Sequence, residues 1–290
     1  MMLKDIKTSF QNGSMLSRLI YLNVGIFILI EVLHVIFFLF NLSSYEILNV
    51  LALSAAPSEL LSKPWSPISY MFVHNGFIHL IFNVLWLYFG GSIFLKYLTN
   101  KQIVSTYILG GLFGGLFYIL SYNYFPAFKA SLSESMAVGS SASVLAILMA
   151  IATYVPNYSV NLTFIGNVKL KHIAIVSIIL DLVLIPKGNA GGHIAHIGGA
   201  FYGFLFSRQL LKGKDISKNF DRIMDYLANA FKSSTPLKTA YKRPQTDDQW
   251  REKKSSEQKQ INLILDKIAK SGYDSLNKEE KETLFKASKK

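Results

Sequence analysis

Long apolar runs dominate the first 211 residues of the chain. Six of them are long enough, or nearly long enough, to cross a bilayer, because a spanning helix needs about 20 mostly apolar residues. None alternates between apolar and polar positions as a barrel strand does, so we predict an all-α fold, a polytopic membrane bundle of six transmembrane helices. The runs are Leu19–Asn41, Phe77–Leu95, Ile103–Ser121, Ser140–Val155, Ile173–Ile185 and Ile194–Leu211.

The same pattern divides the chain into segments. The C-terminal segments are polar, and we expect them to form a small helical cytoplasmic tail without chemistry of its own, beginning with a basic amphipathic helix near the lipid surface. We predict a cytoplasmic N-terminus at residues 1–15, a six-helix domain at 16–211, the amphipathic helix at 212–234, a linker at 235–260 and a helical hairpin at 261–290.

Composition supports a membrane protein. Only 17% of the 290 residues are charged and 51% are apolar, whereas soluble domains carry about 25% charged residues. The chain has no cysteine, which excludes thiolate nucleophiles and cysteine-ligated zinc. The formal net charge of +12 is explained more simply by an anionic lipid surface than by nucleic acid.

Loop charges predict the orientation, since cytoplasmic loops carry an excess of Lys and Arg. With the N-terminus inside, the external loops hold only Lys63, Lys129 and Lys187. Both termini are then cytoplasmic, and the first apolar run is a retained anchor, since it is too long for a signal peptide. The composition is typical of a bacterial inner membrane. The basic residues on the inside are Lys4, Lys7, Arg18, Lys96, Lys101, Lys169, Lys171, Arg208, Lys212 and Lys214.

Four polar side chains fall near the outer ends of three different predicted helices. They are His79 and Asn83 on the second helix, Ser141 on the fourth and His196 on the sixth. Each lies within about two helical turns of the outer end, which corresponds to a depth of about 5–10 Å. Polar groups inside a membrane are expensive and indicate function.

These groups suit nucleophilic acyl transfer. A serine hydroxyl needs a neighbouring base, usually histidine, and the tetrahedral oxyanion needs fixed donors. Ser141 and His196 supply the first pair, and His79 and Asn83 share one helix face as donors. No carboxylate is evident to orient His196, so we predict a Ser–His dyad and interpret Asp181 as a satisfied polar residue.

A metal site is the competing interpretation of His193 and His196. Two imidazoles three residues apart could bind a metal ion. The sequence has no H-E-x-x-H motif and no evident carboxylate nearby, so we expect no metal and no cofactor. His74 is expected either to order its loop or to face water.

Three motifs together resemble the rhomboid family of intramembrane serine proteases. They are Gly139-Ser140-Ser141, Ala195-His196-Ile197-Gly198-Gly199 with Gly203, and the set His74, His79 and Asn83. The resemblance implies Ser141 as nucleophile, His196 as general base and acid, and His79, Asn83 and the Ser141 amide as oxyanion hole. It implies no cofactor, and substrates that are transmembrane helices of other proteins. Residues 42–74 would form the family's interfacial loop.

Three positions depart from the family pattern. Ala142 stands where relatives often have Gly, Ser66 replaces an Arg after Trp65, and Leu145 replaces an aromatic residue that packs on the catalytic His. The third departure would leave His196 without a stacking partner. We also expect Trp65 and Tyr70 to suit the membrane interface.

Two other functions use the same residues. A catalytically silent relative would bind membrane proteins without cutting them, although such relatives usually lack the Ser or the His. A small transporter or channel would need polar residues in the inner half of the bundle, where few occur. The predicted partners are transmembrane protein substrates and membrane lipids, and no nucleic acid.

Overall fold

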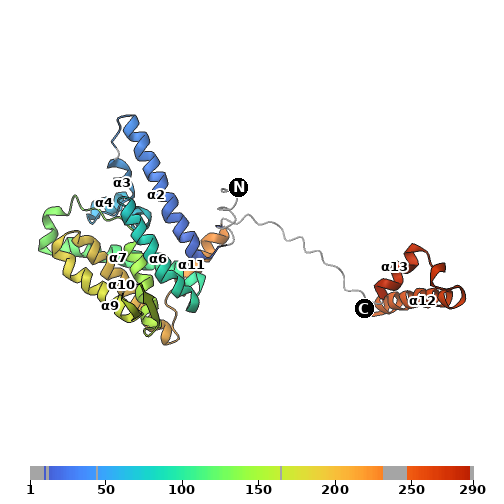
Figure 1. Ribbon diagram of the computed structural model, residues 1–290. Coiled ribbons are helices and arrows are strands. Elements are labelled where there is room, and N and C mark those ends of the chain that lie inside the picture. The colour runs from blue at the N-terminus through green and yellow to red at the C-terminus, as the bar shows by residue number, and fades with distance from the viewer. Residues whose placement is uncertain (1–9, 11–12, 44, 164, 231–246, 288–290) are drawn as a thin grey trace. The chain divides into compact units, whose positions relative to one another are not determined.

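The computed structural model describes residues 10, 13–43, 45–163, 165–230 and 247–287 (Figure 1). The chain divides into two compact units, one through residue 232 and one from residue 233. Each unit is described by itself.

Six main helices build the first unit, and each overlaps one of the predicted apolar runs. Three of the described helices, α2, α6 and α7, are long and apolar enough to cross a bilayer, and α8 is a shorter apolar helix. The predicted all-α membrane fold is confirmed, whereas the number of six spans stays a prediction. The helices are α2 (Met15–Leu39), α6 (Phe77–Tyr97), α7 (Asn100–Tyr124), α8 (Ser141–Tyr154), α9 (Leu170–Leu184) and α10 (Ala190–Leu211).

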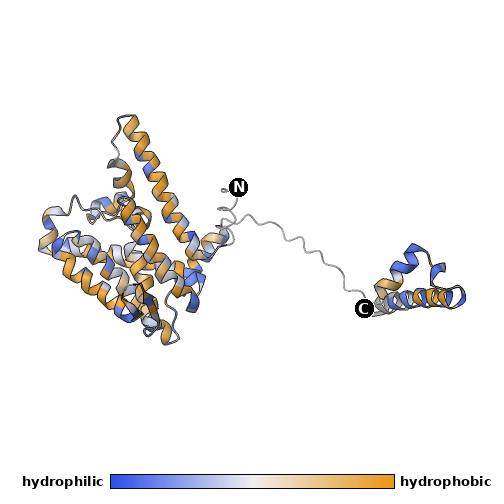
Figure 2. Ribbon diagram, viewed as in Figure 1, coloured by the Kyte–Doolittle hydropathy of each residue, from blue (hydrophilic) through white to orange (hydrophobic). Residues whose placement is uncertain are grey.

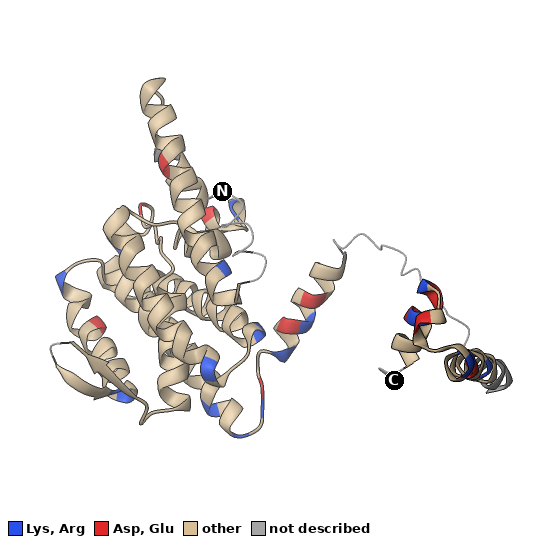
Figure 3. Cartoon of the chain, turned by 45° about the vertical axis from the view of Figure 1, so that its right-hand side comes forward, with Lys and Arg blue, Asp and Glu red and all other residues tan. Residues whose placement is uncertain are grey.

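The outer faces of these helices are apolar. Large exposed hydrophobic side chains cover α2, α6 and α9, among them Leu29, Phe82 and Val183. Figure 2 shows these helices mostly in the hydrophobic colour, and Figure 3 shows few charged residues along them. In water such a surface would be an aggregation site, but hydrocarbon chains can cover it.

Helix α8 lies inside the bundle and packs against α6, α7, α9 and α10. Small residues bring its neighbours close. A Cβ atom on Gly199 of α10 would overlap the carbonyl oxygen of Ala142. Gly203 faces the carbonyl oxygen of Ala146 in the same way, and Gly110 of α7 faces the methyl group of Ala146. The G-x-x-x-G pairs of α7 and α10 therefore hold α8 from two sides.

The loop between α2 and α6 is structured. Trp65 is exposed, as expected at an interface, and its Nε1 donates to the carbonyl of Val50 at 2.8 Å. The same expectation is wrong for Tyr70, which is buried and donates to the carbonyl of Gly111 at 2.6 Å. The loop contains α3 (Tyr45–Leu51), α4 (Pro57–Ser62), α5 (Ser66–Ser69) and η1 (Tyr70–Phe72).

The other connections are short. An antiparallel hairpin of β1 (Ser159–Leu162) and β2 (Gly166–Lys169) joins α8 to α9, and the apolar pattern did not predict it. β1 alternates polar and apolar residues, but over only four residues, and β2 begins with Gly166 and has a single apolar side chain, so the pair gives a weak signal. A 3₁₀ turn, η2 (Pro126–Ser131), follows α7, and another, η3 (Ile185–Lys187), joins α9 to α10.

The polar segments are also helical where described. Helix α11 (Lys218–Ala230) lies within the predicted amphipathic segment. Helix α12 (Asp247–Ser271) begins inside the stretch expected to be a linker, so that boundary is wrong. Gly272 follows with a positive φ of 79°, then η4 (Tyr273–Ser275) and α13 (Lys278–Ala287). Residues 1–9, 11–12, 231–246 and 288–290 of the predicted segments lie outside the described residues.

Candidate active site

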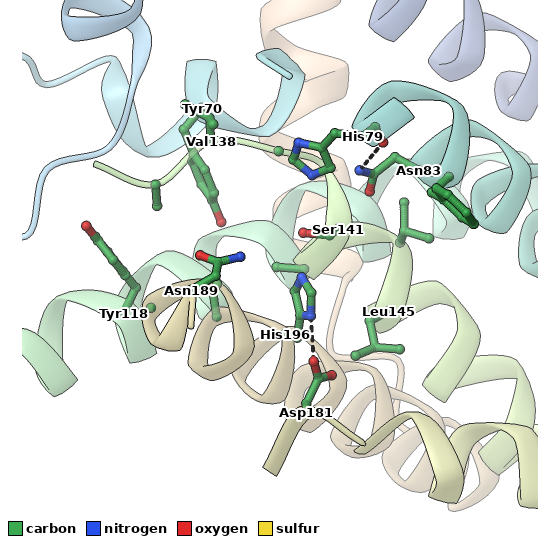
Figure 4. A pocket seen from close by; sticks show the side chains of 18 of the residues that line it. Tyr70, His79, Asn83, Tyr118, Val138, Ser141, Leu145, Asp181, Asn189 and His196 are labelled. Atoms are coloured by element: carbon green, nitrogen blue, oxygen red, sulfur yellow. Dashed lines mark hydrogen bonds and ion pairs between the residues drawn. The ribbon is translucent and has the colours of Figure 1, made fainter. Parts of the chain in front are cut away.

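A cavity of about 810 Å³ contains all four side chains that the sequence singled out. His79 and Asn83 come from α6, Ser141 is the first residue of α8, and His196 comes from α10. Figure 4 shows their side chains directed toward a common space. The structure therefore places the four residues together.

Gly139 sets the approach to Ser141. Its φ of 124° is a conformation that side chains rarely allow. A Cβ atom there would lie 2.8 Å from Cε1 of His79 and 3.6 Å from Oγ of Ser141. The amide of Gly139 donates to the carbonyl of Tyr70 at 2.9 Å, which fixes the turn. The absence of a side chain at Gly139 thus lets the His79 ring lie beside Ser141.

Ser140 occupies the N-cap position of α8 but makes no side-chain capping bond there. Its Oγ instead lies 3.1 Å from Nε2 of His74. His74 is buried and orders the loop, so of the two expectations for this residue the exposed one is wrong. Burial and the neighbouring His79 ring lower the pKa of His74 to about 4. The first turn of α8 begins at Ser141. Backbone amides in the first turn of a helix lack helical partners, so this end of α8 favours an anion.

His79 and Asn83 of α6 offer hydrogen-bond donors to the cavity. The amide of Asn75 donates to Nδ1 of His79 at 3.4 Å. With Nδ1 as acceptor, a neutral His79 ring carries its proton on Nε2, the atom that lies near Gly139. The amide nitrogen of Asn83 donates to the carbonyl of His79 at 2.9 Å, which uses one of its two N–H bonds.

His196 does have a carboxylate partner, and the prediction that none orients it is wrong. Oδ1 of Asp181 lies 2.8 Å from Nδ1 of His196 and 2.8 Å from Nδ1 of His193. In Figure 4 the other ring nitrogen of His196 is directed toward Ser141. Figure 4 marks no hydrogen bond between Ser141 and His196. Such bonds between catalytic groups often form only in the complex with substrate.

The turn between α9 and α10 brings Asp181 to the histidines. Asp181 lies in the last turns of α9, and Gly188 (φ 143°) and Asn189 (φ 49°) reverse the chain. His193 and His196 then lie three residues apart on one face of α10. Asp181 and His196 are each about two helical turns from Gly188, and this near-symmetric spacing is the signal that could have identified the pair.

Among the residues that the structure describes, Asp181, His193 and His196 also form a group that could hold a metal ion. Their ligand atoms, one each from Asp181, His193 and His196, lie within 4.8 Å of one another. The sequence argument against a metal assumed that no carboxylate was near, and that assumption is wrong. Two imidazoles and one carboxylate match a zinc ligand set, but each imidazole already has a hydrogen bond to the carboxylate.

The three departures from the family pattern have structural counterparts. Ala142 is buried, and a Cβ atom on Gly114 would lie 2.5 Å from its methyl group, so a glycine on α7 makes the room. Leu145 lines the cavity without covering His196 as an aromatic ring would, and the neighbouring ring of His196 is His193, edge-on at 5.9 Å between centroids. Ser66 is buried in α5.

Comparison with known proteins gives two family matches. Residues 61–213 match a family described as Rhomboid domain, and residues 245–290 match one described as a family of unknown function, DUF6576. Among curated proteins, "RHOMBOID-like protein 12, mitochondrial" of Arabidopsis thaliana is 26% identical over 156 residues. The aligned region is 51% of this chain and 46% of that protein, so the chain spans less than half of that relative.

Proposed function

The chain belongs to the rhomboid family, and from this membership we propose that it is an intramembrane serine endopeptidase. It hydrolyses peptide bonds in or next to transmembrane helices of other membrane proteins. The observation that carries the proposal is a cavity that Ser141 and His196 line from two helices, with His79 and Asn83 beside them. Family membership alone would also fit a protein that binds membrane proteins without cutting them.

Acyl transfer follows from the roles of the two central groups. Oγ of Ser141 attacks the carbonyl carbon of the substrate while Nε2 of His196 takes the hydroxyl proton. As the C–N bond breaks, His196 gives that proton to the leaving amine. A water molecule then attacks the acyl-enzyme, again giving its proton to His196, and the proton returns to Ser141 when the acid product leaves.

The oxyanion of each tetrahedral intermediate needs donors that already point at it. The Nε2–H of His79, the second N–H of Asn83 and the amide of Ser141 are suitable. Such a donor is worth about 3 kcal/mol in the barrier. His79 and Asn83 stand four residues apart on α6, so a single helix presents both.

Substrate chemistry follows from the same geometry. A peptide bond in an intact helix is hydrogen-bonded and hidden, so the substrate must unwind locally before Ser141 reaches it. We propose substrates with small or helix-weakening residues near the cut, embedded in lipid beside the enzyme. Membrane lipids are the surrounding partners, and the reaction needs no cofactor.

The charge distribution supports an orientation. With both termini in the cytoplasm, Lys96 and Lys101 lie on the inside and Lys187 on the outside, and the cavity opens toward the outer leaflet. We propose this orientation in a bacterial inner membrane. Because the chain has no cysteine, single replacements Lys187→Cys and Lys169→Cys can be labelled in intact cells with an impermeant maleimide. Labelling only at position 169 would show that the protein has the opposite orientation.

The activity is tested by cleavage of a fluorescent transmembrane substrate in proteoliposomes. We expect Ser141→Ala and His196→Ala to reduce cleavage to background. The matched controls are Ser105→Ala, a buried hydroxyl bonded to its own helix, and His172→Ala, an exposed imidazole outside the cavity lining. Both controls should cleave like the parent.

A fluorophosphonate distinguishes a protease from a silent binder. The reagent should label the parent at Ser141, and Ser141→Ala should remain unlabelled. A parent that neither labels nor cleaves, or cleavage that Ser141→Ala retains in full, would contradict the proposal.

A further inference from the structure

We propose that Asp181 is a positioning residue for His196, so that the working unit of this chain is Ser141, His196 and Asp181 rather than a dyad. The proposal rests on the proposed function of Ser141 and His196. Asp181 does not touch the reacting atoms. It acts by fixing the ring orientation and the proton position of His196.

The contact between Asp181 and His196 is short and largely buried. Oδ1 of Asp181 lies 2.8 Å from Nδ1 of His196, and the two side chains are only 10% and 23% exposed. Asp181 comes from α9 and His196 from α10, two helices joined by a short connection through η3. A carboxylate held this way limits rotation of the imidazole about its side-chain bonds, because a different ring position would cost the largely buried carboxylate one of its two imidazole hydrogen bonds.

The hydrogen bond also decides the tautomer. An ionised carboxylate can only accept, so Nδ1 of His196 must carry the hydrogen. In the neutral imidazole the other nitrogen, Nε2, is then unprotonated. Figure 4 shows that nitrogen on the side of the ring that is directed toward Ser141. The tautomer that Asp181 imposes is therefore the one that can take the Ser141 proton.

The charge of Asp181 matters during the proposed reaction. When His196 takes the proton from Ser141, it becomes an imidazolium cation beside the carboxylate. The proton passes on to the leaving amine and Asp181 stays ionised throughout, so its charge stabilises the cation more than it stabilises the neutral ring. That preference for the charged intermediate lowers the barrier rather than tightening substrate binding.

His193 holds the carboxylate itself. Its Nδ1 lies 2.8 Å from the same Oδ1, and its side chain is 16% exposed. Two donors on a single oxygen restrain Asp181 more than one would, and the edge-on contact between the rings keeps them apart at 5.9 Å. His193 thus holds in place the carboxylate that orients His196.

The decisive experiment measures steady-state cleavage of the fluorescent substrate by full-length protein in proteoliposomes. We expect Asp181→Asn to lower kcat by about 10²-fold or more, with KM changed by less than about threefold. The matched control is Asp225→Asn, which removes an exposed carboxylate that is paired with Lys101 and does not line the cavity. It should leave both constants unchanged.

Chemical rescue distinguishes positioning from a merely structural role. Asp181 lines the cavity, so the space left by Asp181→Ala is open to a small carboxylate. Formate should raise the cleavage rate of Asp181→Ala at least about fivefold, chloride at equal ionic strength should not, and neither should affect Ser141→Ala. Low activity without rescue, together with a lowered unfolding temperature, would overturn the proposal in favour of a structural role.

The remaining outcomes are also decisive. Parent-like kcat in Asp181→Asn, with Ser141→Ala inactive, would overturn the role of Asp181 and leave the protease intact. Cleavage by Ser141→Ala at the parent rate would instead refute the proposed function. Activity that a chelator removes and zinc ions restore would also overturn the proposal, because it would assign the three side chains to a metal.

Discussion

Oγ of Ser140 lies 3.1 Å from Nε2 of His74, so the loop before α6 is joined to the residue that precedes Ser141. The bond connects two segments that are far apart in the sequence and buries both side chains. It also leaves α8 without a side-chain cap at Ser140. The stability of this contact depends on the charge of His74.

Acidification should destabilise the fold through His74. Burial, with a smaller effect of the neighbouring His79, lowers the pKa of His74 in the folded chain to about 4, from 6.5. The unfolded chain therefore takes up a proton first as the pH falls. Stability from this residue is complete above about pH 6.5 and is lost progressively down to about pH 4, by on the order of 3 kcal/mol.

The measurement is the unfolding temperature in detergent between pH 7.5 and 4.5. His74→Gln keeps a donor for Ser140 but cannot titrate in this range, so its unfolding temperature should depend less on pH than that of the parent. Equal pH dependence in the two proteins would show that His74 is not the group responsible.

Gly110 of α7 lies against Ala146 of α8, so we predict that exchanging the two residues restores part of the stability that Gly110→Ala loses. A Cβ atom on Gly110 would overlap the methyl group of Ala146, and the next atom is 3.7 Å away. Gly110→Ala should therefore destabilise the bundle by about 1–3 kcal/mol, and Ala146→Gly should cost about 1 kcal/mol through helix propensity. The double variant should lose less than the sum.

Unfolding of the four proteins in the same detergent gives the coupling energy. Gly25→Ala is the control, because a Cβ atom there meets nothing within 4 Å. It should unfold at the parent temperature or slightly above it. Strict additivity of the two single changes would mean that α7 and α8 are not in contact at these positions.

The sequence was sufficient to predict the helices and four residues of the candidate site. The apolar runs each overlap a helix, and the predicted topology starts three of them on the same side of the membrane. That placement brings Ser141 and His196 into one cavity with His79 and Asn83. The roles assigned to these residues, from their chemistry and from the family resemblance, stay a prediction.

What the sequence did not reveal depends on how helices face one another. Asp181 and His196 are fifteen residues apart, and their contact requires the short turn at η3 and the rotation of α9 about its axis. Neither follows from periodicity in a helix that is apolar on nearly all sides. Tyr70 was misplaced for a related reason, since its carbonyl partner belongs to Gly111 on α7.

In the C-terminal unit, the N-terminus of α13 is closed by a reciprocal pair. The side chain of Asn277 accepts from the amide of Glu280, and the Glu280 carboxylate accepts from the amide of Asn277, both at 2.8 Å. Asn277→Ala removes the cap and should cost about 1 kcal/mol. Peptides from α13 should then exchange amide hydrogens about fivefold faster in the full-length protein.

Thr283→Ala is the control for that exchange experiment. Its hydroxyl bonds back to the carbonyl of Glu279 within the same helix, so its loss leaves the helix terminus intact. Exchange in α13 should stay close to that of the parent. An unchanged rate in Asn277→Ala would mean that the pair does not hold the helix in solution.

Two buried serines allow the contribution of one interhelical hydrogen bond to the free energy of unfolding to be measured. Ser207 of α10 donates to the carbonyl of Ala150 on α8 at 2.6 Å, whereas Ser105 of α7 donates to Lys101 of its own helix at 3.1 Å. Both side chains are fully buried. Ser207→Ala should destabilise the bundle by about 0.6–2 kcal/mol, because it removes a buried hydrogen bond that joins α10 to α8. Ser105→Ala should change the unfolding free energy by less than about 0.5 kcal/mol, because each carbonyl keeps its helical bond. Chemical unfolding in mixed micelles gives both values, and a larger loss from Ser105→Ala than from Ser207→Ala would contradict the contact between α8 and α10.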